Sequence, residues 1–225
     1  MEPRGRAIMD ALAAVYGRPE LTPHGDAVAE LILTVLSQNT ADTNSGRAFI
    51  QLMRRFPSWD AIADAAPEEV VAAIQSGGLA QQKAPRIQAI LGAVRERSGD
   101  WNLGFLRDVP LEEARGWLRG LPGVGPKTAA CVLLFALGLP AMPVDTHVER
   151  VAKRLGFIPP KVTAEQAHVL LEALVDPCDY YEFHMLLIKH GRRTCAALRP
   201  QCGVCPIEAV CAASRLRADR DLALP

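Results

Sequence analysis

The sequence lacks a long apolar run, an excess of one charge, and the alternating pattern of a strand. No segment approaches the roughly 18 consecutive apolar residues of a membrane span, and the N-terminal MEPRGRAIMD has no apolar stretch followed by a cleavage site. Lys and Arg number 25, as do Asp and Glu, so the total charge gives no argument for a nucleic-acid partner. We expect a cytoplasmic protein without a membrane partner. An argument for nucleic-acid binding must therefore depend on local patches of basic residues.

Apolar residues recur with helical spacing over most of the 225 residues. The length suits one large domain or two small interlocked ones. The chain is predicted to be all-α. The predicted helix signals are a cap at Asp26, an end at Pro57, a cap at Ser58, first-turn prolines at Pro67 and Pro110, a helix near 87–94, another near 146–155, a capping box at Thr163, and an end at Gly191.

Four of the six cysteines lie close together near the C-terminal end of the sequence, with the spacing Cys-x6-Cys-x2-Cys-x5-Cys. They are Cys195, Cys202, Cys205 and Cys211. A disulfide framework is disfavoured, because the chain has no export signal. Structural zinc usually takes two close pairs of ligands, and only one close pair exists, so the spacing favours an iron-sulfur cluster over zinc. Cys131 and Cys178 are interpreted as buried thiols.

The segment LPGVGPK, residues 121–127, is typical of a tight hairpin between two helices. Gly123 and Gly125 permit positive φ, and Pro126 suits the first position of the next helix. The N-H groups of such a turn, with the positive end of the following helix, attract anions such as DNA phosphates. Lys127 is therefore predicted to lie at an anion-attracting helix start, where it either contacts phosphate or acts chemically.

A second motif is MPVDTHVER, residues 142–150. Asp145 followed by Thr146 and a helical run has the pattern of an N-cap. Taken alone, this aspartate is interpreted as a cap.

Taken together, LPGVGPK, VDTH and the four cysteines resemble the helix-hairpin-helix DNA glycosylases of the endonuclease III family. LTVLSQNTAD (33–42) and SGGLAQQKA (76–84) look like the family's DNA-contacting loops, so the resemblance covers nearly the whole chain. It implies a 4Fe-4S cluster held by the four cysteines. It also implies a helical barrel domain at 26–136 and a cluster domain formed by 1–25 plus 137–225, with the cluster loop at 195–211 and the active site in the cleft between the domains.

The resemblance implies that Lys127 is the nucleophile and Asp145 its assistant in a bifunctional glycosylase and AP lyase. Lys127 would attack the sugar, expel an oxidised pyrimidine and form a Schiff base that undergoes β-elimination. Asp145 would handle protons and stabilise positive charge on the sugar. Attack requires the neutral amine, so the two residues are not expected to form a tight ion pair. The expected partner is duplex DNA with damaged bases or abasic sites, bound by a monomer associated with a bacterial-type nucleoid.

Base flipping requires residues that fill the vacated space. By resemblance, Leu79 matches an apolar wedge, and either Gln38 or Asn39 matches a polar plug. Gly123 and Gly125 would carry the phosphate-contacting turn. Between Glu182 and Glu208 the sequence has no acidic residue, and a predicted DNA-contacting basic patch contains Lys189, Arg192, Arg193 and Arg199.

Three other functions compete with this interpretation. An adenine glycosylase of the same superfamily normally lacks the hairpin lysine, so Lys127 argues against it. A mismatch-specific thymine glycosylase has no such counter-argument. A non-catalytic DNA-binding iron-sulfur protein would not need both Lys127 and Asp145.

Overall fold

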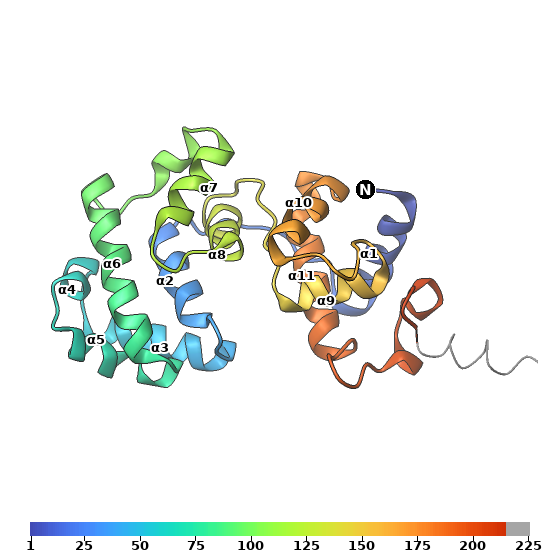
Figure 1. The fold of residues 1–225 in the computed structure, drawn as a ribbon, viewed down its shortest axis with the longest axis horizontal. Helices are drawn as coiled ribbons and strands as arrows, with labels where there is room; N and C mark the ends of the chain where they lie inside the picture. Colours follow the sequence, from blue (N-terminus) through green and yellow to red (C-terminus); the bar gives the residue numbers. More distant parts are fainter. Residues whose placement is uncertain (215–225) are drawn as a thin grey trace, which may run out of the picture. The chain divides into compact units, whose positions relative to one another are not determined.

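The computed structural model describes residues 1–214, which form helices and loops without a strand (Figure 1). The α-helices are α1 (Pro3–Tyr16), α2 (Ala27–Ser37), α3 (Asp42–Arg55), α4 (Trp59–Ala63), α5 (Pro67–Ala73), α6 (Ala80–Ser98), α7 (Leu111–Gly120), α8 (Pro126–Cys131), α9 (Thr146–Leu155), α10 (Ala164–Leu174) and α11 (Tyr180–Arg193). Shorter 3-10 turns are η1 (Gln75–Gly77), η2 (Gly104–Arg107), η4 (Pro177–Asp179), η5 (Cys202–Val204) and η6 (Glu208–Val210), and η3 (Val132–Ala136) is a π-helix. The predicted all-α class is confirmed. No helix in this part of the chain combines the length and the apolar character needed to cross a bilayer.

The chain divides into two compact units. One is continuous, Pro23–Leu139, and is called the hairpin unit because it contains residues 121–127. The other combines Met1–Thr22 with the chain from Pro140 onward and is called the cysteine unit. Each unit has its own set of packed helices.

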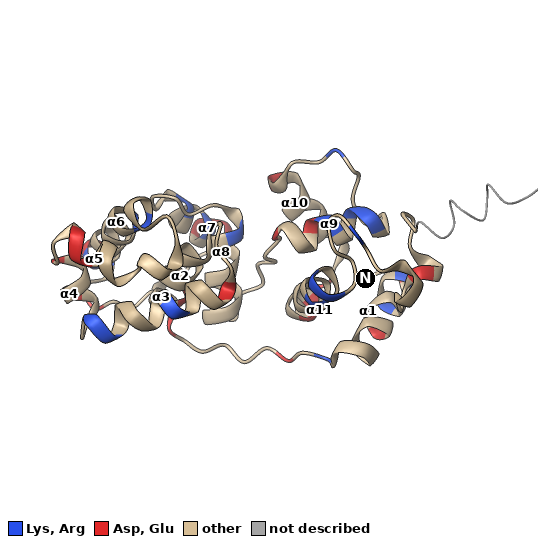
Figure 2. Cartoon of the chain, turned by 90° about the horizontal axis from the view of Figure 1, so that it is seen from below, with Lys and Arg blue, Asp and Glu red and all other residues tan. Residues whose placement is uncertain are grey.

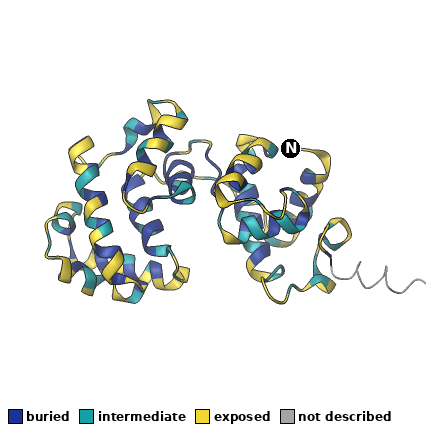
Figure 3. Cartoon of the chain, viewed as in Figure 1, coloured by how far each residue is buried: buried dark blue, intermediate teal, exposed yellow. Residues whose placement is uncertain are grey.

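In the hairpin unit, α2 packs against α3, α6, α8 and η3. It buries seven of its eleven residues, and its start is capped as predicted, since the Asp26 carboxylate accepts a hydrogen bond from Ala29 N-H. The buried positions run along the inward faces of the helices, while their outward faces are largely exposed (Figure 3). The two loops that follow α2 and η1 therefore start from a rigid core.

Most predicted helix boundaries in this unit are confirmed. Phe56 ends α3 just before Pro57, Ser58 caps α4, and Pro67 and Pro126 lie in the first turns of α5 and α8. Pro110 differs by one position, because it is the N-cap of α7 and not part of its first turn.

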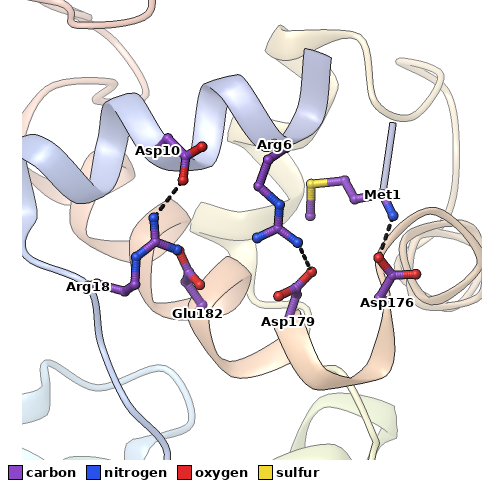
Figure 4. Close-up of polar contacts among 7 residues, drawn as sticks. All are labelled: Met1, Arg6, Asp10, Arg18, Asp176, Asp179 and Glu182. Atoms are coloured by element: carbon purple, nitrogen blue, oxygen red, sulfur yellow. Dashed lines mark hydrogen bonds and ion pairs between the residues drawn. The ribbon is translucent and has the colours of Figure 1, made fainter. Parts of the chain in front are cut away.

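The cysteine unit is built around α11, which packs against α9 and α1. Figure 4 shows charged groups of Met1, α1 and Arg18 that pair with acidic residues of the segment from 176 to 182. Arg6 pairs with Asp179, and Arg18 bridges Asp10 and Glu182. The sequence interpretation had not identified α1. Its buried residues Ile8, Met9 and Leu12 are too few to show a long amphipathic stripe.

Gly191 was predicted to end the last helix, and this is wrong. α11 continues to Arg193, and Thr194 is its C-cap. A Cβ at Gly191 would lie 3.0 Å from His147 Cβ and 3.0 Å from Arg150 Nη2. The glycine therefore allows α9 to approach α11 closely, which is a packing requirement that local sequence signals do not reveal.

Candidate functional site

The hairpin between α7 and α8 has the tight turn that its glycines predict, but only one glycine supplies a positive φ. Gly123 has φ +73, whereas Gly125 has φ −92 and extended backbone. Val124 between them is buried, and its N-H donates to Leu121 O at 3.1 Å. The turn is thus anchored by an apolar side chain pointing into the core.

Lys127 lies in the first turn of α8 and is half-buried. Pro126 precedes it at the start of the helix, where the missing N-H costs no helical hydrogen bond. Thr128, which follows, is buried. The helix therefore fixes the position of the Lys127 backbone.

A carboxylate that the sequence interpretation missed lies near this lysine. Glu30 on α2 is only 13 % exposed, and it accepts a hydrogen bond from Thr34 Oγ1 at 3.0 Å and lies 3.3 Å from His24 Nε2. Burial raises the pKa of Glu30, while its bonds to Thr34 and His24 and the positive charge of Lys127 oppose that rise. The one signal in the sequence was a carboxylate within an otherwise apolar helix.

The two candidate plug residues have different surroundings. Gln38 Nε2 donates to Gly123 O at 3.0 Å, and Gln38 Oε1 accepts from Arg86 Nη1 at 2.8 Å. A Cβ at Gly123 would overlap the Arg86 side chain. Gln38 and Arg86 thus hold the hairpin, and Gln38 is committed to that contact. Asn39 is exposed, with a left-handed backbone at φ +52.

Leu79 is also exposed and left-handed. Its φ is +53, it is the N-cap of α6, and 47 % of the residue is accessible to solvent. Large apolar residues rarely adopt this backbone region, because Cβ crowds the following carbonyl oxygen. The fold therefore presents this side chain outward at a conformational cost.

Asp145 belongs to the cysteine unit and is the N-cap of α9, as predicted. Its Oδ1 accepts hydrogen bonds from His147 N-H at 2.9 Å and Val148 N-H at 2.7 Å. The residue is half-buried. The two N-H donors hold this carboxylate in a fixed orientation at the start of α9.

The four clustered cysteines line one cavity of about 80 Å³ within the cysteine unit. All four are partly accessible, and α9 and α11 supply much of the remaining wall. Burial raises the pKa of Cys205, and negative charge on the other three thiols acts in the same direction. Among residues 1–214, no three His, Cys, Asp or Glu side chains already lie in positions to share one metal ion. Four sulfur donors that line one cavity nevertheless fit a group that binds thiolates.

Arginines from α9 hold the cysteine segment by its backbone. Arg154 donates to Ala196 O at 2.8 Å and Ala197 O at 2.7 Å, and its Nη1 lies 3.2 Å from Cys195 Sγ. Arg150 donates to Gly191 O at 2.8 Å and to Cys195 O at 3.2 Å. Sequence reasoning missed both residues, because their acceptors are carbonyls about forty positions away.

The basic residues that are predicted to contact DNA differ in their exposure. Arg192 and Arg193 are exposed at the end of α11, where Figure 2 shows basic residues. Lys189 is half-buried, and its amine donates a hydrogen bond to Tyr16 O at 3.2 Å. One of its hydrogen-bond donors is therefore used within the cysteine unit. Of the two isolated cysteines, Cys131 is buried as expected. Cys178 is exposed, because it lies in the short surface turn η4.

Comparisons with known proteins agree on the family. A model described as "HhH-GPD superfamily base excision DNA repair protein" matches residues 32–177. The chain is 35 % identical over 192 residues to endonuclease III of Thermotoga maritima, covering 85 % of each chain. It is 39 % identical over 162 residues to a candidate DNA glycosylase of Arabidopsis thaliana, covering 72 % of this chain and 55 % of that relative. The chain thus spans little more than half the length of that relative.

A solved structure is similar over nearly the whole chain. It is a trapped covalent intermediate of endonuclease III with DNA, 31 % identical, with a TM-score of 0.81 and coverage of 97 % of this chain and 100 % of that one.

Proposed function

Because the chain belongs to the HhH-GPD superfamily of base excision DNA repair proteins, we propose that it is an endonuclease III-like DNA glycosylase with AP lyase activity. Its substrates are oxidised pyrimidines and abasic sites in duplex DNA. The observation that carries the proposal is Lys127, a half-buried lysine held in the first turn after the hairpin. A glycosylase that uses water has no need of an amine at this point.

The proposed reaction proceeds through a covalent bond between Lys127 and the sugar. The neutral amine of Lys127 attacks C1′ of the damaged nucleotide, the N-glycosidic bond breaks, and the base leaves with the proton that the attacking nitrogen releases. The C1′–O4′ bond then breaks, O4′ takes a proton from solvent, and an iminium links Lys127 Nζ to C1′. Loss of a C2′ proton expels the 3′ phosphate by β-elimination, and water hydrolyses the iminium to release the enzyme.

Asp145 stabilises the positive charge that develops on the sugar while the base departs. Its orientation is set by the N-H groups of His147 and Val148, so no reorganisation is needed when the charge appears. Glu30 lies close enough to Lys127 in the hairpin unit for the positive charge of the lysine to oppose the rise in the pKa of Glu30.

The proposal also assigns DNA contacts to residues in both units, from their exposure and hydrogen bonds. We assign the plug to Asn39, since Gln38 is bonded to the hairpin. Leu79 is the wedge, because it is exposed and its backbone is fixed. The turn at Gly123 and Gly125 and the basic residues Arg192 and Arg193, with Lys189, contact phosphates.

The residues Cys195, Cys202, Cys205 and Cys211 fit a 4Fe-4S cluster, since all four line one cavity and iron accepts thiolate ligands. When bound, the cluster cross-links a segment that has little helix of its own. Its role is structural, and no step of the reaction passes through it.

Borohydride trapping on a duplex with one oxidised pyrimidine tests the proposal. Wild-type protein should form a covalent adduct that Lys127→Ala does not form, while both bind the duplex with similar affinity. Asp145→Asn keeps an acceptor for the helix cap and removes the charge, so we expect base release to fall by about 100-fold with little change in stability.

Other outcomes separate the alternatives. Base release without an adduct would contradict the lyase and indicate a monofunctional enzyme. An adduct only with a thymine mismatch would identify a mismatch glycosylase. Neither product across a lesion panel would indicate a DNA-binding protein without catalysis.

A further inference from the structure

Lys83 is a lysine in the core of the hairpin unit, and the reaction does not use it. The residue is only 2 % exposed, although a lysine is almost never fully buried without partners. Its amine donates to Leu36 O at 2.6 Å, to Thr40 Oγ1 at 2.8 Å and to Gly77 O at 2.9 Å. The three donors of an ammonium thus meet three oxygen acceptors.

The three acceptors belong to two segments that are far apart in the sequence. Leu36 and Thr40 flank the turn that contains Asn39, at the end of α2. Gly77 lies two positions before Leu79, and its carbonyl also accepts from Thr40 Oγ1 at 2.6 Å. One buried cation therefore fastens the segment 36–40 to the segment 77–79.

Both segments also carry backbone strain. Asn39 and Leu79 are two of the three non-glycine residues with positive φ among residues 1–214, at +52 and +53. A conformation of this kind costs on the order of 1 kcal/mol and persists only where the surroundings enforce it. The turn around Gly77 is pressed onto α3, since a Cβ at Gly77 would lie 2.9 Å from Ala48 Cβ. The three hydrogen bonds of Lys83 help to hold both segments in these conformations.

We propose that Lys83 is a positioning residue that fixes the plug residue Asn39 and the wedge residue Leu79 relative to each other before DNA binds. This inference rests on the proposed function, because it needs both residues to enter the duplex. A preformed pair avoids the entropy of ordering two loops at the moment when a base is flipped. Burial lowers the pKa of Lys83, with the nearby charge of Arg86 adding to the effect, but the three acceptors match the charged form.

The test compares trapping on two abasic substrates that differ in their need for insertion. A duplex abasic site requires the wedge and plug to fill the stack, whereas a single-stranded abasic site does not. Lys83→Met retains the length of the side chain and removes all three donors. Thr40→Val is a second variant of similar volume, which removes one acceptor of Lys83 together with the hydroxyl that donates to Gly77 O. Lys161→Met is the matched control, since Lys161 is exposed and lies in the other unit.

For Lys83→Met we expect duplex trapping to slow by about 10- to 100-fold, the range associated with displacing a positioning group by about 1 Å. Single-strand trapping by the same variant should change by less than about 3-fold, and Thr40→Val should lie between wild type and Lys83→Met on the duplex. Lys161→Met should match wild type on both substrates. Equal losses on both substrates would overturn the proposal and make Lys83 a general stability residue. No loss on the duplex would overturn it as well.

A double-mutant cycle gives a second readout, which survives even if Lys83→Met is less stable. If Lys83 acts through Leu79, adding Lys83→Met to Leu79→Ala should slow duplex trapping far less than it slows wild type. Fully multiplicative losses would contradict the proposal. Absence of trapping by wild type on either substrate would instead count against the lyase function itself.

Discussion

The hairpin unit and the cysteine unit secure their functional loops in different ways. In the hairpin unit, Gln38 donates to the carbonyl of Gly123, Lys83 donates to the carbonyl of Gly77, and Arg86 donates to the Gln38 side chain. In the cysteine unit, residues 195–214 contain only two 3-10 turns and are held through backbone carbonyls by Arg150 and Arg154. The first unit contains its own supports, whereas the second leaves four thiols around a cavity.

This difference bears on the proposed roles of the two units. The hairpin unit holds the proposed nucleophile Lys127 by its own packing, and the proposed cluster would cross-link a segment in which hydrophobic packing is sparse. A segment with few buried apolar side chains needs a metal or another cross-link to offset its conformational entropy. We therefore expect loss of the cluster to unfold the cysteine segment and to leave the hairpin intact.

The largest effect is expected for Cys205→Ser. The variant should lose the broad visible absorbance of an iron-sulfur protein, and residues 195–211 should become sensitive to protease. The loss in stability of the cysteine unit should be several kcal/mol, as is common when metal binding and folding are coupled. Absorbance spectra, iron analysis and limited proteolysis measure these changes.

The control is Cys178→Ser, which alters an exposed cysteine outside the cavity and should leave colour and protease resistance unchanged. A colourless wild-type protein containing zinc would refute the cluster. Unchanged absorbance in Cys205→Ser would refute the ligand assignment.

An intermediate effect is expected for Gly123→Ala in the hairpin unit. The new Cβ would combine a positive φ with an overlap against the Arg86 side chain, so the free energy of unfolding should fall by about 1–2 kcal/mol. In an Arg86→Ala background the overlap is absent, and Gly123→Ala should cost less. Thermal unfolding of the four proteins measures this coupling, and equal costs in both backgrounds would contradict the contact.

The smallest effect concerns the pH dependence of stability through Glu30. Burial raises its pKa above the ordinary value of 4.5, so the folded state binds more protons than the unfolded state between these two values. The contribution to stability is fully present below pH 4.5 and is lost as the pH rises through the raised pKa. His24 and Lys127 face the same carboxylate and oppose the shift.

Glu30→Gln should remove this loss, so that its stability relative to wild type increases as the pH rises above 4.5. Urea unfolding between about pH 4 and pH 7 measures the difference. Glu96→Gln, at an exposed position of α6, is the control and should follow wild type. A difference that does not vary with pH would show that Glu30 does not titrate differently in the folded state.

Local signals predicted much of the fold because they act over a few residues. Asp26, Ser58 and Thr163 cap helices through their own side chains, and each cap was readable from the sequence. The prediction of a helix end at Gly191 is wrong because the role of this glycine is not local. It lets α9 approach α11. Glycine after an apolar run signals a helix end only when no neighbouring helix requires the space.

The sequence by itself determined the all-α class, the hairpin, the cap at Asp145 and the grouping of four cysteines, because these features depend on short-range spacing. Only the tertiary structure decided that Gln38 donates a hydrogen bond to the hairpin and that Glu30 interacts electrostatically with Lys127. It also decided that Lys83 joins two segments that are distant in the sequence. Such roles depend on carbonyls and charges brought together by packing. A buried polar side chain bonds to whichever groups the packed core places beside it. The spacing of residues in the sequence does not show how far along the chain those partners lie.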